Sequence, residues 1–173
     1  MAEPRWYALY VRSRSEKRVA DRLQEKQVDA FVPLVEELHT WSDRTKAVME
    51  PLFRGYVFVR TDLTNRETVL NAEGVVRFVG IRQRPSPIPD VQIESLRIVA
   101  RHPSRVMREQ RVIRGQRVRV IAGPCEGVEG IVTDVRGESR VVVMVDVISQ
   151  SVSVMVTAGC LEEIGAVESC PAA

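Results

Sequence analysis

The feature that most constrains the fold is a series of short valine-rich runs in the last third of the chain. These runs cover residues 118–121, 131–135, 140–147 and 151–156, and short breaks that contain glycine or serine separate them. Side chains branched at Cβ favour extended backbone, and the runs are too short for stable helices. Short strands with tight turns are typical of a small barrel, because closure of the sheet leaves no unpaired edge. The sequence therefore predicts an all-β barrel over residues 112–164.

The first hundred residues carry a different pattern, in which strand and helix signals alternate. We expect strands over residues 6–11, 30–35, 53–60 and 75–80, and helices that begin near residues 14, 64 and 90. The order β-α-β-β-α-β with a trailing helix is that of the ferredoxin-like split βαβ arrangement, in which helices cover one face of an antiparallel sheet. The chain is therefore predicted to be an α+β protein with a first domain over residues 5–102.

Two capping boxes are predicted to start the first two helices. In such a box a hydroxyl accepts from an amide of the first turn, and a glutamate three residues later reaches back to the cap amide. The first box runs from Ser13 to Glu16, and its helix is expected to end near Lys26. The second box covers residues 64–67, with a helix that ends near Gly74. Between the two helices, the polar stretch at 36–50 is expected to form an exposed loop or hairpin.

The third predicted strand indicates a surface as well as a core. Alternation places Val57 and Val59 on one face, together with Phe53. Tyr56 and Phe58 are predicted to lie on the opposite face, which the helices do not need to cover. Aromatic side chains left on an open sheet face are typical interface anchors, so this face is a candidate binding surface.

The net charge of +2 is the remainder of two unequal parts of the chain. Residues 1–119 carry 23 basic and 15 acidic side chains, a balance of +8, whereas residues 120–173 carry 2 and 8, a balance of −6. Such asymmetry indicates two modules with different partners. Between them, the arginine-rich stretch at 103–111 is predicted to be a basic flexible linker, and residues 165–173 a disordered tail.

The sequence carries no catalytic or metal-binding pattern. His39 and His102 stand apart from other metal-ligating side chains, whereas such ligands normally come in pairs at fixed spacing. Three widely spaced cysteines argue against a disulfide framework and favour a reducing cytoplasm. No apolar run approaches the roughly 18 residues of a membrane helix, and the N-terminus lacks a signal peptide. We therefore expect a cytoplasmic monomer that needs no cofactor or metal and is not an enzyme.

Residues 114–132 resemble the KOW motif, which consists of a strand, a Gly-Pro turn and a second strand that starts at a glycine. The turn residues are Gly123, Pro124, Gly127 and Gly130. The first and third of these permit turn dihedrals, and the last lets the second strand start close to the first. Segments 5–10, 50–59, 78–80 and 84–88 resemble, in the same order, the N-terminal domain of the NusG family. The resemblance covers residues 5–164 and implies that the second domain is an SH3-like barrel.

The resemblance implies a transcription elongation factor that binds RNA polymerase and modulates pausing or termination. Arg54 replaces a proline that is usual in the family, which favours a specialised, RfaH-like antitermination paralogue that acts at selected operons. The first domain is then expected to dock on the β′ clamp helices through Trp6, Tyr7, Tyr10, Phe53, Arg54, Tyr56 and Phe58. A second polymerase contact is expected at Asn65, Arg66, Glu67 and Thr68. The second domain is expected to bind a small-subunit ribosomal protein or Rho through Val142, Met144 and Ile148.

Two further interpretations remain open from the sequence. Basic side chains surround the first predicted helix, namely Arg12, Arg14, Lys17, Arg18 and Arg22. They form either a solvated face or a contact with nucleic-acid phosphates. The segment at 54–59 also resembles the RNP1 signature, so Tyr10, Tyr56 and Phe58 could stack on bases in an RNA-binding adaptor of the ribosome or of RNA metabolism. An RfaH-like switch of the second domain to helices is disfavoured by its β-branched runs.

Overall fold

The computed structural model describes residues 3–40, 44–81, 84–103, 106–109, 115–135, 138–157 and 160–165. The chain divides into two compact units. The first comprises residues 1–93 with Val145–Ser149, and the second comprises the remainder from Glu94 onward. Over the described ranges, no helix is long and apolar enough to cross a membrane.

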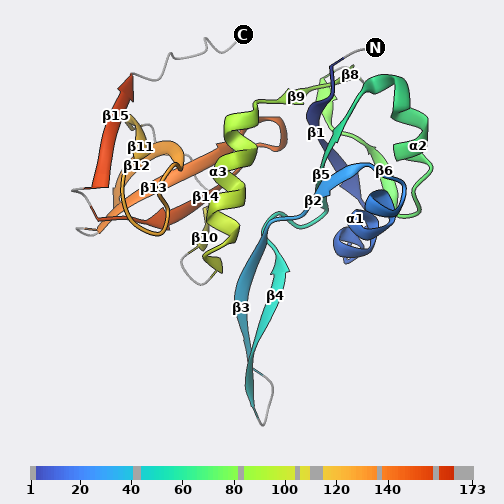
Figure 1. The fold of residues 1–173 in the computed structure, drawn as a ribbon. Helices are drawn as coiled ribbons and strands as arrows, with labels where there is room; N and C mark the ends of the chain where they lie inside the picture. Colours follow the sequence, from blue (N-terminus) through green and yellow to red (C-terminus); the bar gives the residue numbers. More distant parts are fainter. Residues whose placement is uncertain are drawn as a thin grey trace. The chain divides into compact units, whose positions relative to one another are not determined.

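The first unit is built on an antiparallel sheet with the strand order β2-β5-β1-β6 (Figure 1). Its strands are β1 (Arg5–Val11), β2 (Asp29–Phe31), β5 (Tyr56–Thr61) and β6 (Val75–Phe78). The central strand β1 pairs with β5 on one side, and on the other side with both β6 and the short β9 (Pro87–Ile88). Strands far apart in the sequence therefore lie side by side.

Helices α1 (Glu16–Glu25) and α2 (Arg66–Leu70) supply the apolar stripe that covers one face of this sheet. Val19 and Leu23 of α1 are fully buried in a cluster with Leu9, Val57 and Val59 from the strands. Burial of each such side chain contributes about 1.5–3 kcal/mol relative to exposure, so this cluster supplies much of the stability of the unit.

Both predicted capping boxes are wrong. Helix α1 begins at Glu16 after Ser15, with no side-chain cap. The Glu16 carboxylate instead accepts a hydrogen bond of 2.7 Å from the amide of Gly55. At the second site a 3-10 turn precedes α2, and Asp62 caps this turn by accepting from the amide of Thr64. At the first site Glu16 binds Gly55, which lies outside the predicted box. At the second site the capping residue is Asp62, which also lies outside the predicted box.

A second two-stranded sheet, formed by β3 (Leu34–Thr40) and β4 (Thr45–Pro51), projects as a hairpin from the first unit (Figure 1). This hairpin confirms one of the two predictions for residues 36–50. The single strand expected over residues 30–35 is instead divided into β2 and β3 on either side of Pro33, which lacks an amide proton for a ladder hydrogen bond.

The remaining elements of this part of the chain are a small ladder and a helix. Strands β7 (Gly80–Ile81) and β8 (Arg84–Pro85) pair with each other. A Cβ at Gly80 would overlap the carbonyl oxygen of Arg84, so this close pairing requires glycine. Helix α3 (Asp90–Ala100) follows, and its start at Asp90 confirms the prediction for the third helix.

The second unit contains a six-stranded sheet in the order β10-β14-β13-β12-β11-β15. Its strands are β10 (Val106–Glu109), β11 (Arg117–Val120), β12 (Glu129–Val135), β13 (Glu138–Val145), β14 (Gln150–Met155) and β15 (Leu161–Gly165). Four of them are the valine-rich runs predicted from the sequence. Antiparallel partners join β10 to β14, β12 to β13 and β11 to both β12 and β15.

Two segments differ from the extended chain that the sequence predicted. Residues 106–109, expected in a flexible linker, form β10 and pair with β14. Gly165, expected at the start of the tail, belongs to β15, and the rest of the predicted tail lies outside the described residues. Both segments gain backbone hydrogen bonds from a strand that is distant in sequence, a contact that local composition does not reveal.

The glycines of the predicted turn have the expected conformations. Gly123 has φ +93° and Gly127 has φ +90°, values that other residues rarely adopt. Gly130 pairs with Val118 at the start of the second strand, as expected. It also lies at a close approach on its other side, where a Cβ would overlap the carbonyl oxygen of Val142 on β13.

Candidate functional site

Three side chains lie in one row across the helix-free face of the first sheet. Tyr10 on β1 pairs directly with Tyr56 on β5 and, on its other side, with Arg77 on β6. Directly paired residues of antiparallel strands point to the same face. The two tyrosines and the arginine are therefore neighbours on the surface opposite α1 and α2, and we call them the Tyr-Tyr-Arg row.

The Tyr-Tyr-Arg row is open to solvent and internally ordered. Tyr10 is 40% exposed, Tyr56 is half-buried and Arg77 is exposed. The rings of Tyr10 and Tyr56 meet edge to face, with centroids 5.8 Å apart. The Arg77 guanidinium carbon lies 5.5 Å from the centroid of the Tyr10 ring, within reach of a cation–π attraction. Contacts of this kind reduce the entropy that the row would lose on binding a partner.

A glycine turn holds the row in place. Gly55 precedes Tyr56 with φ +82°, and a Cβ on it would lie only 3.3 Å from the Tyr10 ring. The Gly55 carbonyl accepts from the amide of Val11, and its own amide donates to the buried Glu16 carboxylate. Glu16 therefore positions the turn that carries Tyr56. The sequence pattern instead predicts that Glu16 closes a capping box.

The other aromatic residues expected in the docking surface are buried. Phe58 is fully buried between the rings of Phe31 and Phe53, which have centroids 6.4 and 5.9 Å from its own. Phe53 thus lies on the Phe58 side of the sheet, because the turn at Gly55 interrupts the predicted alternation. The exposed position predicted for Phe58 is wrong, and a buried ring is not free to stack on a base as the RNP1-like alternative requires.

Trp6 and Tyr7 at the start of β1 are buried as well. Trp6 lies on the helix-free face but is only 3% exposed. Tyr7 belongs to the cluster under the helices and packs edge to face on Phe78, with ring centroids 6.0 Å apart. Alternation along β1 turns Tyr7 to the face that the helices cover, so its ring is not exposed as a docking contact requires.

The second predicted contact segment, residues 65–68, is largely exposed at the start of α2. Asn65, Arg66 and Glu67 are exposed, and Thr68 is half-buried. The Arg66 guanidinium carbon lies 6.0 Å from the centroid of the Phe78 ring. The segment is thus a surface element that rests on the edge of the core.

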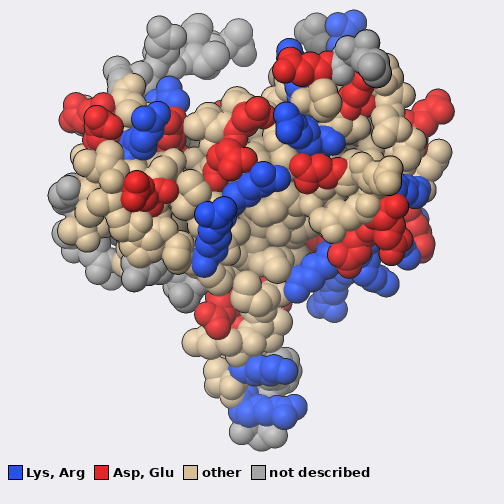
Figure 2. Space-filling view, viewed as in Figure 1, with Lys and Arg blue, Asp and Glu red and all other residues tan. Residues whose placement is uncertain are grey.

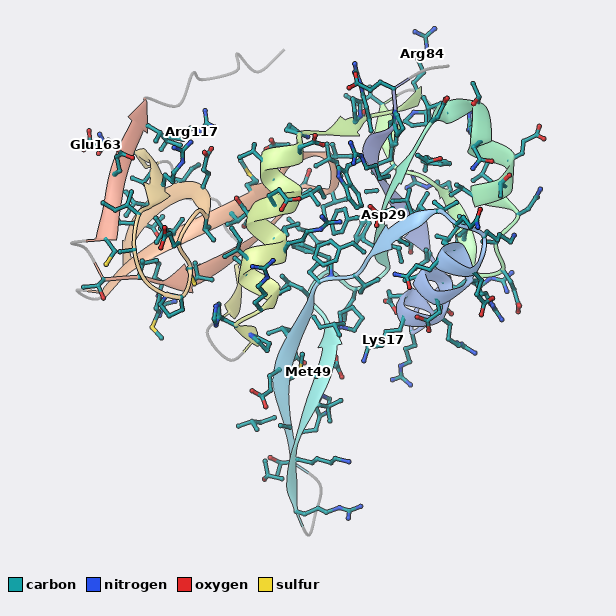
Figure 3. The ribbon with its side chains drawn as sticks, viewed as in Figure 1. Lys17, Asp29, Met49, Arg84, Arg117 and Glu163 are labelled. Carbon is teal, nitrogen blue, oxygen red and sulfur yellow. The ribbon has the colours of Figure 1, made fainter. Side chains whose placement is uncertain are left out.

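The basic residues predicted to meet nucleic acid surround α1. Figure 2 shows Lys and Arg side chains gathered over this helix. In the part of the chain that the structure describes, Arg12, Arg14 and Arg18 are exposed and have no carboxylate within ion-pairing distance. Two others are engaged, because Arg22 pairs with Glu73 at 2.7 Å and Lys17 donates to the carbonyl of Met49 at 2.7 Å (Figure 3).

A polar cluster on the hairpin was not predicted from the sequence. Nε2 of His39 lies 2.9 Å from an oxygen of Glu50, and Glu37 lies nearby on the same face. The Arg54 guanidinium contacts both carboxylates, at 2.7 Å to Glu50 and 3.2 Å to Glu37. His39 is therefore not isolated, because cross-strand pairing brings together residues 11 positions apart. Glu37, His39 and Glu50 could ligate a metal, and the Arg54 guanidinium contacts both of the carboxylates.

The residues predicted to form the partner face of the second domain are mostly buried, and one of them, Ile148, belongs to the Val145–Ser149 segment of the first unit. Val142 is 2% and Ile148 7% exposed, so the prediction that they face outward is wrong, whereas Met144 is half-buried. The valine runs of β13 are buried on both faces, and alternation alone could not distinguish this from one-sided burial.

Two arginines of β11 in the second unit share one carboxylate. Arg119 donates to Glu129 at 2.6 and 3.0 Å, and Arg117 lies 3.5 Å from the same carboxylate. The hydrogen bond to Glu129, followed by the charge of that carboxylate, raises the pKa of Arg119. The neighbouring strand β15 adds the acidic side chains Glu162 and Glu163, so the arginines here lie among carboxylates (Figure 3).

Comparison with known proteins gives consistent results over this architecture. The model of a family described as "Transcription termination factor nusG" matches residues 4–97, just over half of the chain. Among curated relatives, the transcription termination/antitermination protein NusG of Thermus thermophilus is 29% identical over 170 residues, covering 86% of this chain and 92% of the relative. The Helicobacter pylori NusG is 30% identical over 142 residues, covering 69% of this chain and 74% of the relative.

A solved structure of NusG from Thermotoga maritima has a similar fold. It aligns with a TM-score of 0.53 at 22% sequence identity and covers 94% of this chain and 98% of that chain. At this level of identity the match supports the fold alone.

Proposed function

Because the chain belongs to the NusG family and is a transcription elongation and antitermination factor, we propose that it docks on RNA polymerase through the Tyr-Tyr-Arg row. The observation that carries this proposal is the edge-to-face pair of Tyr10, which is 40% exposed, and the half-buried Tyr56 on the sheet face opposite α1 and α2. Tyrosine and arginine are enriched among the residues that dominate binding energy at interfaces. Family membership also favours a role without catalysis.

The buried aromatic residues support the docking surface rather than form it. The Phe53 carbonyl accepts a hydrogen bond of 3.3 Å from the amide of Tyr56, and its ring packs on Phe58. Trp6 and Phe58 fill the same face of the sheet at its buried end. Substitution of these residues is therefore expected to act on stability first and on binding second. Arg54 is expected to affect docking indirectly, through its ion pairs with Glu37 and Glu50 of the hairpin.

The polymerase element that we propose as the docking partner is the pair of β′ clamp helices. A row of aromatic side chains on an open sheet face suits a helical hairpin, because tyrosine rings can pack into the grooves between the side chains of its helices. Residues 65–68, exposed on a different part of the unit, are proposed to meet the opposite wall of the polymerase cleft.

The unpaired arginines around α1 are proposed to approach nucleic-acid phosphates in the bound complex. Arg12, Arg14 and Arg18 present guanidinium groups without described carboxylate partners, and such groups gain most from phosphate neutralisation. The contact would be independent of sequence, because phosphates position a protein without specifying bases.

For the second unit we propose a KOW-type, SH3-like barrel that binds a protein. The positive φ values at the Gly-Pro turn and the antiparallel strand order support this assignment. Its exposed acidic strand β15 and its paired arginines favour a protein partner, either a small-subunit ribosomal protein or Rho, over nucleic acid. For the first unit, the order β2-β5-β1-β6 with α1 and α2 on one face supports the split βαβ arrangement.

Specialisation for selected operons is a further part of the proposal. The Arg54 contacts with Glu37 and Glu50 support it, since they give the hairpin a charged base in place of the proline usual at this position in the family. Transcription of reporter operons with and without the factor would test this specialisation. Equal effects at all operons would contradict it.

Binding to purified core RNA polymerase tests the docking proposal. We expect Tyr56→Ala and Tyr10→Ala each to weaken binding about tenfold to a hundredfold, the range of residues that dominate interfaces. Leu38→Ala, an exposed apolar residue of the hairpin, is the matched control and should bind as the unaltered chain does. Unchanged affinity of both tyrosine variants, with folding intact by circular dichroism, would refute the docking surface.

A further inference from the structure

We propose that Arg77 recognises a carboxylate on the protein partner beside the Tyr10 contact. This inference rests on the docking role of the Tyr-Tyr-Arg row and adds to it a charged group with a defined chemical counterpart. The sequence pattern does not mark Arg77 as a binding residue, because it stands between valine and phenylalanine in a predicted strand.

The sheet geometry places Arg77 within the docking surface. It pairs directly with Tyr10 across β1 and β6, so its side chain emerges from the same face. The guanidinium lies 5.5 Å from the Tyr10 ring centroid and is exposed. A partner that covers Tyr10 would therefore also cover or border the guanidinium.

The charge of Arg77 is uncompensated in the described ranges of the chain. Several other arginines have a carboxylate within 3.5 Å, namely Arg22, Arg54, Arg97, Arg117 and Arg119. No carboxylate of the described residues lies within ion-pairing distance of Arg77. A guanidinium that enters an interface without an acid must find one on the partner, since an unpaired buried charge opposes binding.

The contact with Tyr10 favours a carboxylate as the counterpart. The guanidinium of Arg77 lies over the Tyr10 ring at cation–π distance, and its N–H groups can still donate two parallel hydrogen bonds to a partner. A carboxylate accepts both bonds in the same plane as the guanidinium. Because Arg77 shares its row with two tyrosines, its counterpart belongs to the surface that contacts those rings, which is protein in the proposed docking mode.

Phosphate is the competing counterpart, and core polymerase without nucleic acid separates the two. We would measure affinity of the full-length chain for core polymerase and for an assembled elongation complex, over a range of salt concentrations. The test variants are Arg77→Met, which keeps an apolar stem against Tyr10, and Arg77→Lys, which keeps the charge but loses the planar fork. Arg84→Met, an exposed arginine on β8 (Figure 3), is the control.

We expect Arg77→Met to weaken binding to both polymerase forms about tenfold and to reduce the salt dependence of binding. Arg77→Lys should recover part of this loss, and Arg84→Met should behave as the unaltered chain. A merely structural role of Arg77 over Tyr10 would leave the salt dependence unchanged, and this result would overturn the proposal. So would a loss seen only in the elongation complex, which would assign the contact to phosphate.

The same measurements distinguish this inference from the docking proposal. If Tyr56→Ala weakens binding but Arg77→Met does not, the carboxylate contact is refuted and the docking surface stands. If neither variant changes the affinity, the docking surface itself is refuted. Melting temperatures of all variants should remain within a few degrees, because Arg77 is exposed.

Discussion

Exposed arginines described in the two units differ in whether a carboxylate lies within ion-pairing distance of the guanidinium. In the second unit, Arg117 and Arg119 flank a single carboxylate, that of Glu129, and lie beside an acidic strand. In the first unit, Arg12, Arg14 and Arg77 are exposed and have no described carboxylate partner. The arginines of β11 are therefore engaged with a carboxylate of their own chain, whereas Arg12, Arg14 and Arg77 of the first unit have no such partner among the described residues.

This difference shows that the pairing of charges carries more functional information than their number. The sequence balance of +8 and −6 indicated a basic and an acidic part. The structure adds that several basic residues of the first part are themselves neutralised, such as Arg22 by Glu73 and Arg54 by Glu50. Among the basic residues without a described carboxylate partner, Arg12, Arg14 and Arg18 lie around α1 and Arg77 lies in the Tyr-Tyr-Arg row.

The strongest test of the comparison neutralises arginines in each unit. The combined change Arg12→Gln, Arg14→Gln and Arg18→Gln is expected to weaken binding to elongation complexes about a hundredfold at low salt and to flatten its salt dependence, because phosphate contacts are lost. The matched change Arg117→Gln with Arg119→Gln should alter the affinity less than twofold. Fluorescence anisotropy of a labelled chain would measure both, and equal effects from the two sets would break the comparison.

Removal of the Glu16 carboxylate tests how the first unit holds its docking turn. Glu16→Ala leaves the buried amide of Gly55 without its acceptor and is expected to lower the free energy of unfolding by about 2 kcal/mol. Urea unfolding followed by tryptophan fluorescence would report it, since both tryptophans lie in the first 41 residues. The exposed Glu25→Ala on the same helix is the control, and a similar loss there would show that the effect does not come from the Gly55 hydrogen bond.

A pair of glycine substitutions separates backbone strain from binding. Gly55→Ala and Gly123→Ala both place a side chain at positive φ, at a cost of about 1–2 kcal/mol. Only Gly55 has the Tyr10 ring near its Cβ direction, whereas Gly123 has open space. Polymerase binding should therefore fall for Gly55→Ala and remain unchanged for Gly123→Ala. Equal binding by both variants would show that the turn does not position Tyr10.

The smallest effect is expected in the second unit. Glu129→Gln removes the charge shared by the two half-exposed arginines of β11, and ion pairs at the surface contribute about 0–1 kcal/mol. Thermal unfolding of the variant should therefore change little, while the freed arginines should raise nonspecific retention on heparin. A large loss of stability would show that this network is structural, and would remove the contrast between the units.

The sequence predicted the elements whose signal is local. The valine runs became strands of the second sheet, α3 begins at Asp90, and Gly123 and Gly127 adopt positive φ. Predictions failed where tertiary partners decide the outcome. Glu16 binds Gly55 and not its own helix cap, because an amide 39 residues away is buried beside it.

The candidate site was predictable only in part for the same reason. Tyr10 and Tyr56 belong to the surface that the sequence indicated, but Phe58 is buried by Phe31 from a strand whose boundary Pro33 obscured. The Arg77 contact and the His39 cluster depend on strand register, which one sequence does not specify.

Site-specific photo-cross-linking tests the central claim most directly. A photoreactive phenylalanine analogue at position 10 would place the probe in the docking row, and the same analogue at position 163 would place it on the exposed strand β15 of the second unit. With purified RNA polymerase, we predict that position 10 captures the polymerase and position 163 does not. Capture from position 163 without capture from position 10 would contradict the assignment of polymerase binding to the first sheet.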